Sequence, residues 1–250
     1  MTGTFRRMSF KGASHPQKQY GGLMSEFTLY NYFRSSTSYR VRIALELKQI
    51  KYDYKPVHLL NNGGEQNGAE YRSLNATGGV PTLVHLHQGQ QKIIGQSLAI
   101  IEYIDDIKPD LKPLFPKEAY TKSLVKQFCE NINADTHPYG NLKTLQYLEK
   151  EFHIDSDQKT KWIQHWINLG LTACEKMIAT HKGQFCFSDT LTAADLCLVP
   201  QLVSAERFQV DIKKYSHLYK IYNHCMTIVA FKTAHPFNQI DTPEDLKQKS

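Results

Sequence analysis

A run of hydroxyl side chains, Ser35, Ser36, Thr37 and Ser38, separates a stretch rich in aromatic and β-branched residues from one with helical apolar spacing. Hydroxyls at such a junction can cap a helix N-terminus, where unpaired N–H groups and a partial positive charge stabilise an anion or a thiolate. Taken alone, the run is more often only a helix cap, because motifs this short have low specificity. It therefore marks a candidate anion site whose ligand has to be inferred from other features.

The elements that must position these hydroxyls are a strand over 27–33 and the helix after it, whose apolar residues recur at i, i+3, i+4 and i+7 from Val41. Further patterns predict a strand over 52–57, a short helix over 65–74, strands over 80–86 and 92–94 joined by a turn, and a helix over 98–104 after Gln96-Ser97. This β-α-β-α-β-β-α order predicts a small mixed sheet covered by helices.

Three prolines within 108–116 mark a domain boundary. Beyond it, residues 162–178 trace one apolar helical face, which we expect to end at Gly183. Thr192 and Asp195 form a capping box for a further helix, 214–231 predicts another, and Thr242-Pro243 opens a short last one. We therefore predict one domain over 25–107, a linker over 108–116, and an all-helical domain over 117–250.

Length and composition narrow the class of protein. The 250 residues, 41% of them hydrophobic, suffice for two compact domains. Residues 1–24 hold four cations and no acid, so they supply four of the six net positive charges, and the remainder does not predict a nucleic-acid partner. This segment lacks an apolar run and ends at Met24, so we interpret it as a leader or an appended segment that is disordered.

Membrane, disulfide and metal signals are all weak. No stretch approaches the roughly 18 apolar residues of a membrane span, so we expect no membrane partner and a cytoplasmic location. The five cysteines form no C-x-x-C pair, and their odd number predicts reduced, mostly buried thiols. The eleven histidines do not fall at metal-ligand spacing with them, so we expect no metal site.

Several motifs, taken together in chain order, resemble the cytosolic glutathione transferases, and within them the zeta class. Residues 35–44, SSTSYRVRIA, are similar to the zeta-class signature S-S-C-x-[WH]-R-V-R-I-A, with Thr37 in place of its cysteine. Further matches are GVPTL at 79–83, QSLAIIEY at 96–103, ADLCLVPQ at 194–201 and NQIDTP at 238–243. The resemblance covers about residues 25–245 and implies a thioredoxin-like βαβ-ββα domain followed by an all-α domain.

The zeta class is the family of maleylacetoacetate isomerase, which acts in tyrosine and phenylalanine breakdown. The resemblance therefore implies a glutathione-dependent cis–trans isomerase that converts maleylacetoacetate, a diketo diacid, to fumarylacetoacetate, with glutathione transferase activity and a homodimeric assembly. Two alternatives keep the same site: maleylpyruvate isomerisation, and processing of α-haloacids. A third is a non-catalytic binding or regulatory protein on the transferase fold.

The cofactor's thiol needs help to ionise, because a free thiol with a pKa near ~8.5 is only a few per cent thiolate at pH 7. A pKa shift of ~2 units corresponds to ~2.7 kcal/mol, within reach of one charge-assisted hydrogen bond and a helix terminus. A hydroxyl donated by Ser35 or Ser36, together with backbone N–H groups at the helix start, would favour the thiolate, so both serines are candidate catalytic residues. The resemblance assigns the sulfur contact to the first of them, Ser35, with Ser36 adjacent. Thr37 at the cysteine position implies that turnover requires no thiol there.

The resemblance also implies contacts along the rest of the tripeptide. Val80 would pair its backbone with the extended peptide if the Val80–Pro81 bond is cis, and Ser97 would bind the γ-glutamyl carboxylate. The further cofactor contacts that it implies are Thr37, Arg40, Gln66, Gln96, His137, Asn141 and Leu142. Of these, His137 stands where the family usually has a glutamine.

A dicarboxylic substrate requires cations. Arg40 lies one turn from Ser36 on the apolar face of its helix, which places it near the site, and we expect it to contact cofactor and substrate. Arg207 matches the family arginine that reaches the substrate carboxylate from the helical domain. Arg42, on the opposite face with Glu46 at i+4, is interpreted as a solvated surface pair.

Overall fold

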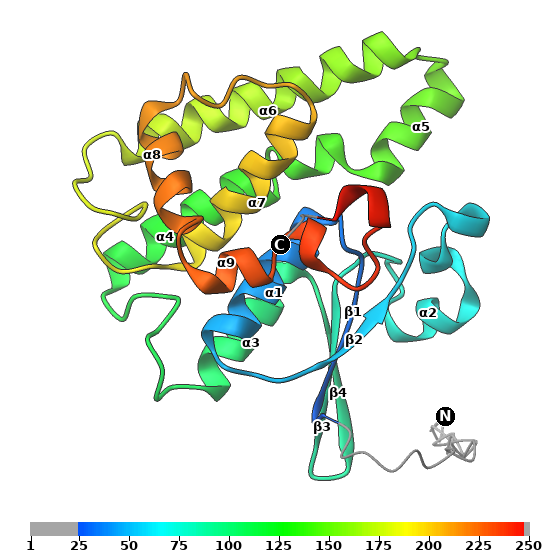
Figure 1. Cartoon of the computed structure of the whole chain (residues 1–250), viewed down its shortest axis with the longest axis horizontal. Helices are drawn as coiled ribbons and strands as arrows, with labels where there is room; N and C mark the ends of the chain where they lie inside the picture. The colour runs from blue at the N-terminus through cyan, green and yellow to red at the C-terminus, as the bar shows by residue number, and fades with distance from the viewer. Residues whose placement is uncertain (1–24, 248–250) are drawn as a thin grey trace, which may run out of the picture.

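The structure is a computed structural model that describes residues 25–247 (Figure 1). The first part of the chain contains a four-stranded mixed sheet. The strands are β1 (Phe27–Asn31), β2 (Asp53–Pro56), β3 (Thr82–His87) and β4 (Gln90–Gly95), in the order β2-β1-β3-β4. β1 is parallel to β2 and antiparallel to β3, which pairs antiparallel with β4. The predicted mixed sheet is confirmed, whereas the leader proposed at 1–24 lies outside the described residues.

Helices cover both faces of this sheet (Figure 1). They are α1 (Ser36–Leu47), α2 (Ala69–Leu74) and α3 (Ser97–Ile107), with short 3-10 turns η1 (Asn61–Gly63) and η2 (Glu65–Asn67) before α2. α1 and α3 pack side by side, while α2 lies on the other side of the sheet. The single short helix predicted over 65–74 is thus split into η2 and α2.

All elements after α3 within the described residues are helical. They are α4 (Ala119–Asn133), η3 (His137–Gly140), α5 (Leu142–Phe152), α6 (Ser156–Ile178), α7 (Ala193–Arg207), α8 (Ser216–Cys225), α9 (Val229–Thr233), η4 (Pro236–Asn238) and η5 (Glu244–Leu246). The capping box at the start of α7 is confirmed, because Asp195 accepts the Thr192 N–H at 2.8 Å. None of the helices in residues 25–247 has the length and apolar content that a membrane crossing requires.

Three helix ends differ from the sequence predictions. α6 ends at Ile178 rather than near Gly183, whose added Cβ would lie 2.5 Å from the Ser188 carbonyl oxygen in the following loop. The helix predicted over 214–231 is divided into α8 and α9, because the backbone leaves helical geometry at Ile228, which has φ −78° and ψ 130°. The predicted last helix is only the 3-10 turn η5.

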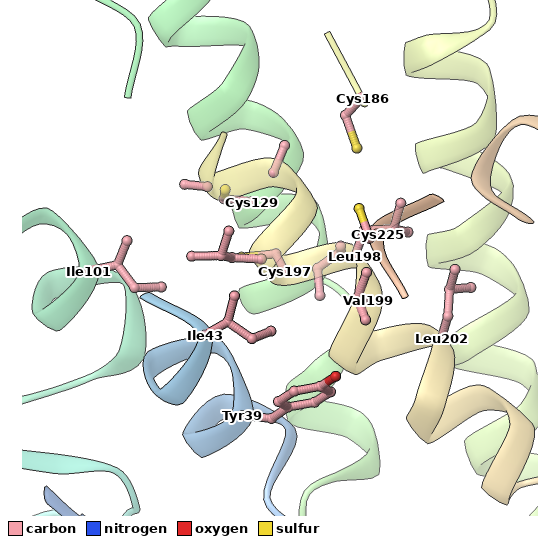
Figure 2. Packing of buried hydrophobic residues seen from close by; sticks show 14 of the residues in the cluster. Tyr39, Ile43, Ile101, Cys129, Cys186, Cys197, Leu198, Val199, Leu202 and Cys225 are labelled. Carbon is pink, nitrogen blue, oxygen red and sulfur yellow. The ribbon is translucent and has the colours of Figure 1, made fainter. Parts of the chain in front are cut away.

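The core lies where α7 packs against both α1 and α4 (Figure 2). Figure 2 shows Ile43 of α1, Ile101 of α3, and Leu198 and Leu202 of α7 converging on this region, and these four residues are fully buried. All five cysteines are free and buried, as predicted. The helical half thus covers the face of α1 opposite the sheet.

Arg42 corrects one interpretation. It is fully buried, and its guanidinium donates to the carbonyl oxygens of Ala234 at 3.0 Å and Phe33 at 3.0 Å. α1 is buried on all sides because α9 also packs against it, and its residues 38–45 are all buried. The interpretation of Arg42 as a solvated surface pair with Glu46 is therefore wrong.

His235 predicts a loss of stability in mild acid. The ring is 6% exposed, its Nδ1 accepts the Phe237 N–H at 3.2 Å, and burial together with Arg42 lowers the pKa of His235 to about 4. An unfolded histidine titrates near pH ~6.5, so between these values the unfolded chain binds the extra proton. We expect the free energy of unfolding to fall by about 3 kcal/mol from this group as the pH drops from ~6.5 to ~4.

Urea unfolding of the wild type and of His235→Asn, measured between about pH 7 and about pH 5, checks this expectation. The asparagine keeps an acceptor for the Phe237 N–H but does not titrate. The wild type should therefore lose stability more steeply with acid than the variant does. Equal slopes for the two proteins would contradict the prediction.

Candidate active site

The hydroxyl run lies at the start of α1, at the end of β1. Ser35 is the N-cap, with φ −69° and ψ 119°, and its Oγ accepts the Ser38 N–H at 3.1 Å. Ser35, Ser36 and Thr37 are half-buried rather than enclosed in the core. The capping function of Ser35 is observed, and its contact with a ligand stays a prediction.

The C-terminal segment holds this turn in place. Asp241 accepts the Phe33 N–H at 2.9 Å, and the Tyr39 hydroxyl donates to the Phe231 carbonyl oxygen at 2.8 Å. Ser35 N–H itself donates to the Tyr32 carbonyl oxygen at 3.0 Å. Sequence reasoning did not identify Asp241 as a support for the site, although it falls within the NQIDTP motif.

Thr37 joins the hydroxyl turn to the segment before β3. Its Oγ1 donates to the Val80 carbonyl oxygen at 2.9 Å and lies 2.9 Å from Ser35 Oγ. The Val80–Pro81 peptide bond is cis, as predicted. The Tyr71 hydroxyl, which donates to the Gly79 carbonyl oxygen at 2.6 Å, supports the same segment from α2. The turn and the Val80 backbone therefore form one surface on which an extended peptide can lie.

Ser97 and Arg40 form a second polar group at the start of α3. Ser97 is 2% exposed, and Gln96 before it is exposed and has φ +66°, a conformation uncommon for residues other than glycine and enriched at ligand sites. Arg40 is fully buried and donates from Nη1 to Ser97 Oγ at 3.3 Å and to Asn133 Oδ1 at 3.0 Å. Its charge thus lies behind Ser97, where it favours a carboxylate bound to that hydroxyl.

Gln66 offers an acceptor that no protein group uses. Its side chain is 9% exposed, and Nε2 donates to the Leu59 carbonyl oxygen at 3.3 Å. Oε1 is buried and has no hydrogen-bond partner among the described residues. A buried orphan acceptor is uncommon in native proteins, and the N–H of a bound peptide would satisfy it. The position of Gln66 therefore fits the contact implied by the family resemblance.

His137 comes to the hydroxyl turn from the helical half of the chain. Its Nδ1 lies 3.3 Å from Ser36 Oγ, and its Nε2 lies 3.4 Å from Asn141 Nδ2. Asn141 is the N-cap of α5, which begins at the half-buried Leu142. Burial, followed by the charges of Arg40 and Lys143, lowers the pKa of His137 to about 3, so the ring is neutral at pH 7.

α6 fixes the segment that carries His137. Trp162 Nε1 donates to the Tyr139 carbonyl oxygen at 2.8 Å, and the Tyr139 ring stacks on Trp166 with centroids 3.8 Å apart. A Cβ on Gly170 would lie only 1.9 Å from Thr136 Oγ1, so only glycine permits this approach of α6. The sequence pattern identified these α6 residues as an apolar face but did not connect them with the site.

Two arginines influence each other electrostatically: Arg34, directly before the hydroxyl turn, and Arg207. Arg207 is exposed at the end of α7, and burial of part of its guanidinium, followed by the charge of Arg34, lowers its pKa. Both charges also act on the Tyr32 hydroxyl. None of the ion pairs within residues 25–247 involves either arginine. Sequence reasoning missed Arg34, whose position directly before Ser35 was the available signal.

Chemically, this arrangement can hold an elongated anionic ligand. The helix N-terminus and its hydroxyls favour a negative charge at one point, and Ser97 with Arg40 favours a carboxylate at another. Arg34 and Arg207 offer cations for a second anionic molecule. Of the predicted contacts, the Arg40 guanidinium is fully buried and donates to Ser97 Oγ.

Comparisons with known proteins identify relatives of this chain. Residues 34–107 match the family model described as the glutathione S-transferase N-terminal domain. The chain is 41% identical to the maleylacetoacetate isomerase of Dictyostelium discoideum over 213 aligned residues. These residues cover 85% of this chain and 94% of that protein.

Two solved structures are also similar over most of their length. A holo maleylpyruvate isomerase, a bacterial zeta-class glutathione S-transferase, has a TM-score of 0.81 and 37% identity, covering 86% of this chain and 100% of that one. The maleylacetoacetate isomerase of Anaeromyxobacter dehalogenans 2CP-1, with glutathione bound in its active site, has a TM-score of 0.79 and 33% identity. That comparison covers 88% of this chain and 99% of the other.

Proposed function

This chain belongs to the zeta class of glutathione transferases, the family of the maleylacetoacetate isomerases, and we propose that it converts maleylacetoacetate to fumarylacetoacetate with glutathione as cofactor. The reaction is a cis–trans isomerisation, which we place in tyrosine and phenylalanine breakdown. We also propose a glutathione transferase activity at the same site. The experiments below separate this substrate from the main alternative.

The residues at the start of α1 and α3 fit glutathione. We assign Ser97, with the Arg40 charge behind it, to the γ-glutamyl carboxylate, and the Val80 backbone to the peptide groups of the tripeptide. The orphan acceptor of Gln66 is satisfied by an N–H of the same peptide. When bound, glutathione supplies a sulfur nucleophile that adds reversibly beside a keto group and so permits rotation about the former double bond.

The observation that carries the substrate class is the pair of cations Arg34 and Arg207. Like charges that influence each other electrostatically, without an acidic partner among the ion pairs of residues 25–247, favour the binding of an anion. Arg34 directly precedes Ser35 in the chain, which supports the binding of such an anion next to the predicted sulfur site. A diketo diacid has carboxylates at both ends, and we propose that these arginines hold one of them.

Isomerisation assays with and without glutathione test the proposed function. We expect conversion of maleylacetoacetate only when glutathione is present, and no net loss of glutathione over many turnovers. The isomerisation changes the oxidation state of neither the substrate nor glutathione. We therefore expect that no redox cofactor is required. Isomerisation at an equal rate without glutathione would contradict the proposal.

Maleylpyruvate is the second candidate substrate, because the similar holo structure with a TM-score of 0.81 is a maleylpyruvate isomerase. Both compounds present a cis double bond between a keto group and a carboxylate, so the site described above accommodates either chemically. We expect a higher kcat/KM for maleylacetoacetate. A higher kcat/KM for maleylpyruvate in the same preparation would reverse our choice.

We extend the proposal to organisation and assembly. Residues 25–107 would form the glutathione-binding domain, and residues 117–250 the substrate-binding domain. The family relationship also favours a homodimer, which sedimentation analysis of the full chain would test. The five buried free thiols favour a reducing compartment, and we propose the cytoplasm.

A further inference from the structure

The proton of the Ser35 hydroxyl can be located from the directions of the hydrogen bonds around it. A serine or threonine hydroxyl has one proton to donate, whereas a carbonyl oxygen only accepts. Thr37 Oγ1 lies 2.9 Å from the Val80 carbonyl oxygen, so Thr37 donates its proton there. Towards Ser35 Oγ, 2.9 Å away, Thr37 can then only accept. The proton of Ser35 is therefore directed at Thr37.

This arrangement withdraws Ser35 from a ligand. Its Oγ also accepts the Ser38 N–H at 3.1 Å. The Ser35 hydroxyl thus accepts one hydrogen bond, from Ser38, and donates its only proton to Thr37. To donate to a bound sulfur, Ser35 would have to give up its hydrogen bond with Thr37. A cysteine at position 37, as in the zeta-class signature, accepts hydrogen bonds much more weakly and would leave the Ser35 proton freer.

The hydrogen bonds around Ser36 run in the opposite direction. Asn141 Oδ1 accepts the Lys143 N–H at 3.2 Å, which orients the amide so that its Nδ2 faces His137 Nε2 at 3.4 Å. An amide NH2 group only donates, so Nε2 is the acceptor and the ring proton is on Nδ1. Nδ1 lies 3.3 Å from Ser36 Oγ and donates to it. The proton of Ser36 is left free for a ligand.

The surroundings of His137 maintain the neutral ring that this chain of bonds requires. The charged groups whose fields reach the ring are Arg40 on α1 and Lys143 on α5, and both oppose a positive imidazolium. From α4 and α6, the groups that contact this segment are uncharged: Asn131, through its carbonyl oxygen, and Trp162. Contacts with α6 thus hold the η3 segment, and within residues 25–247 no acidic side chain pairs with the ring.

We propose that Ser36, oriented by the hydrogen-bond chain through Asn141 and His137, donates the hydrogen bond that stabilises the thiolate of bound glutathione. His137 is then a positioning residue that acts through Ser36, and Thr37 keeps Ser35 from the sulfur. The inference rests on the proposed function, since it takes glutathione as the ligand. It differs from the assignment that the family resemblance implies, in which Ser35 contacts the sulfur. The thiol proton leaves to water, because Ser36 and His137 both act as donors.

Nitrogen NMR of the histidine-labelled protein tests the hydrogen-bond directions without any ligand. The variant His137→Gln identifies the signals of His137 by their disappearance. We expect a neutral ring with its proton on Nδ1, unchanged from about pH 7 down to about pH 5. A proton on Nε2, or a ring that becomes positively charged in this range, overturns the inference.

The thiolate absorption that appears on adding glutathione, followed against pH, tests the donor itself. Ser36→Ala should raise the pKa of the bound thiol by about 1 to 2 pH units, because a charge-assisted hydrogen bond changes such an equilibrium roughly 10- to 100-fold. Ser35→Ala is the matched control, and we expect a smaller shift. Thr37→Val removes the group that accepts the Ser35 proton, so it should lower the pKa of the bound thiol. A larger shift in Ser35→Ala than in Ser36→Ala overturns the inference.

His137 variants separate positioning from a general structural effect. His137→Leu should raise the pKa of the bound thiol as Ser36→Ala does, and should add nothing in the Ser36→Ala background. His137→Gln, whose amide can both donate and accept, should restore most of the wild-type value. A His137→Leu shift that persists in full without Ser36 overturns the inference. If the wild type binds no glutathione, the proposed function fails as well, even where NMR finds the proton on Nδ1.

Discussion

Replacing Arg42 with alanine is expected to lower the free energy of unfolding by about 3–5 kcal/mol. The guanidinium is fully buried, and its Nη1 donates to Asn31 Oδ1 at 2.9 Å. Its Nε and Nη2 donate to the carbonyl oxygens of Ala234 and Phe33, each at 3.0 Å. Removal of the side chain leaves these buried acceptors without donors and creates a cavity between α1 and the C-terminal segment.

Urea unfolding of three variants measures this effect. Arg42→Lys keeps the charge but not the planar fork of donors, so its stability should fall between those of the wild type and Arg42→Ala. Glu46→Ala is the matched control, because a surface pair would make the two alanine variants similar. We expect Glu46→Ala within about 1 kcal/mol of the wild type. An Arg42→Ala protein as stable as Glu46→Ala would contradict the structure.

The contacts of Arg42 belong to a wider attachment of the C-terminal segment to the site. Arg42 reaches Ala234, Tyr39 reaches Phe231, and Asp241 accepts the Phe33 N–H. These bonds fix the end of β1 and the first turns of α1 from residues about 200 positions further along the chain. The geometry of the hydroxyl turn therefore depends on both halves of the protein.

Local signals in the sequence predicted the order of the elements correctly in the first half of the chain, whereas α4 and α5 were not predicted. The β-branched and aromatic run before Ser35 predicted β1, the hydroxyl N-cap predicted α1, and the Thr192–Asp195 capping box predicted the start of α7. These signals concern residues within a few positions of each other, so they do not depend on tertiary contacts. The mixed sheet followed from the same order by general rules of chain connection.

The predictions that failed depend on distant contacts. The face of α1 that carries Arg42 is buried by α9, which no local pattern near Arg42 indicates. Residues 214–231 are divided into two helices by the extended backbone of Ile228, in a stretch whose apolar spacing continues through it. The spacing of apolar residues and their helix propensity therefore identified helices. They did not show where these helices end or which of their faces other elements cover.

In the candidate site too, the sequence identified residues but not the contacts between distant parts of the chain. The resemblance placed His137 and Asn141 among the cofactor contacts, and the structure adds which atoms meet: His137 Nδ1 with Ser36 Oγ, across 101 positions of the chain. The buried orphan Oε1 of Gln66 and the electrostatic influence of Arg34 on Arg207 are likewise visible only in three dimensions. The roles of these residues in binding glutathione and substrate remain predictions.

Arg207→Ala and Arg34→Ala should each lower kcat/KM for the diacid substrate by about 10- to 100-fold. A charge-assisted hydrogen bond to a carboxylate contributes about 1.5–3 kcal/mol. Because a carboxylate is held alike in the ground and transition states, the loss should appear mainly as a raised KM. Steady-state kinetics with glutathione at saturation measure both parameters.

The double variant decides whether the two arginines hold the same carboxylate. The charge of Arg34 lowers the pKa of Arg207, so the two guanidinium groups influence each other electrostatically, and we propose that they hold the same carboxylate. We therefore expect their effects to be less than additive, by about 1 kcal/mol or more. Lys213→Ala, which removes an exposed cation, is the control for a general loss of positive charge and should leave KM unchanged. Transfer of glutathione to an uncharged electrophile should also be unchanged in both arginine variants. Fully additive losses would instead assign the arginines to opposite ends of the diacid, and no loss in either single variant would remove them from the substrate site.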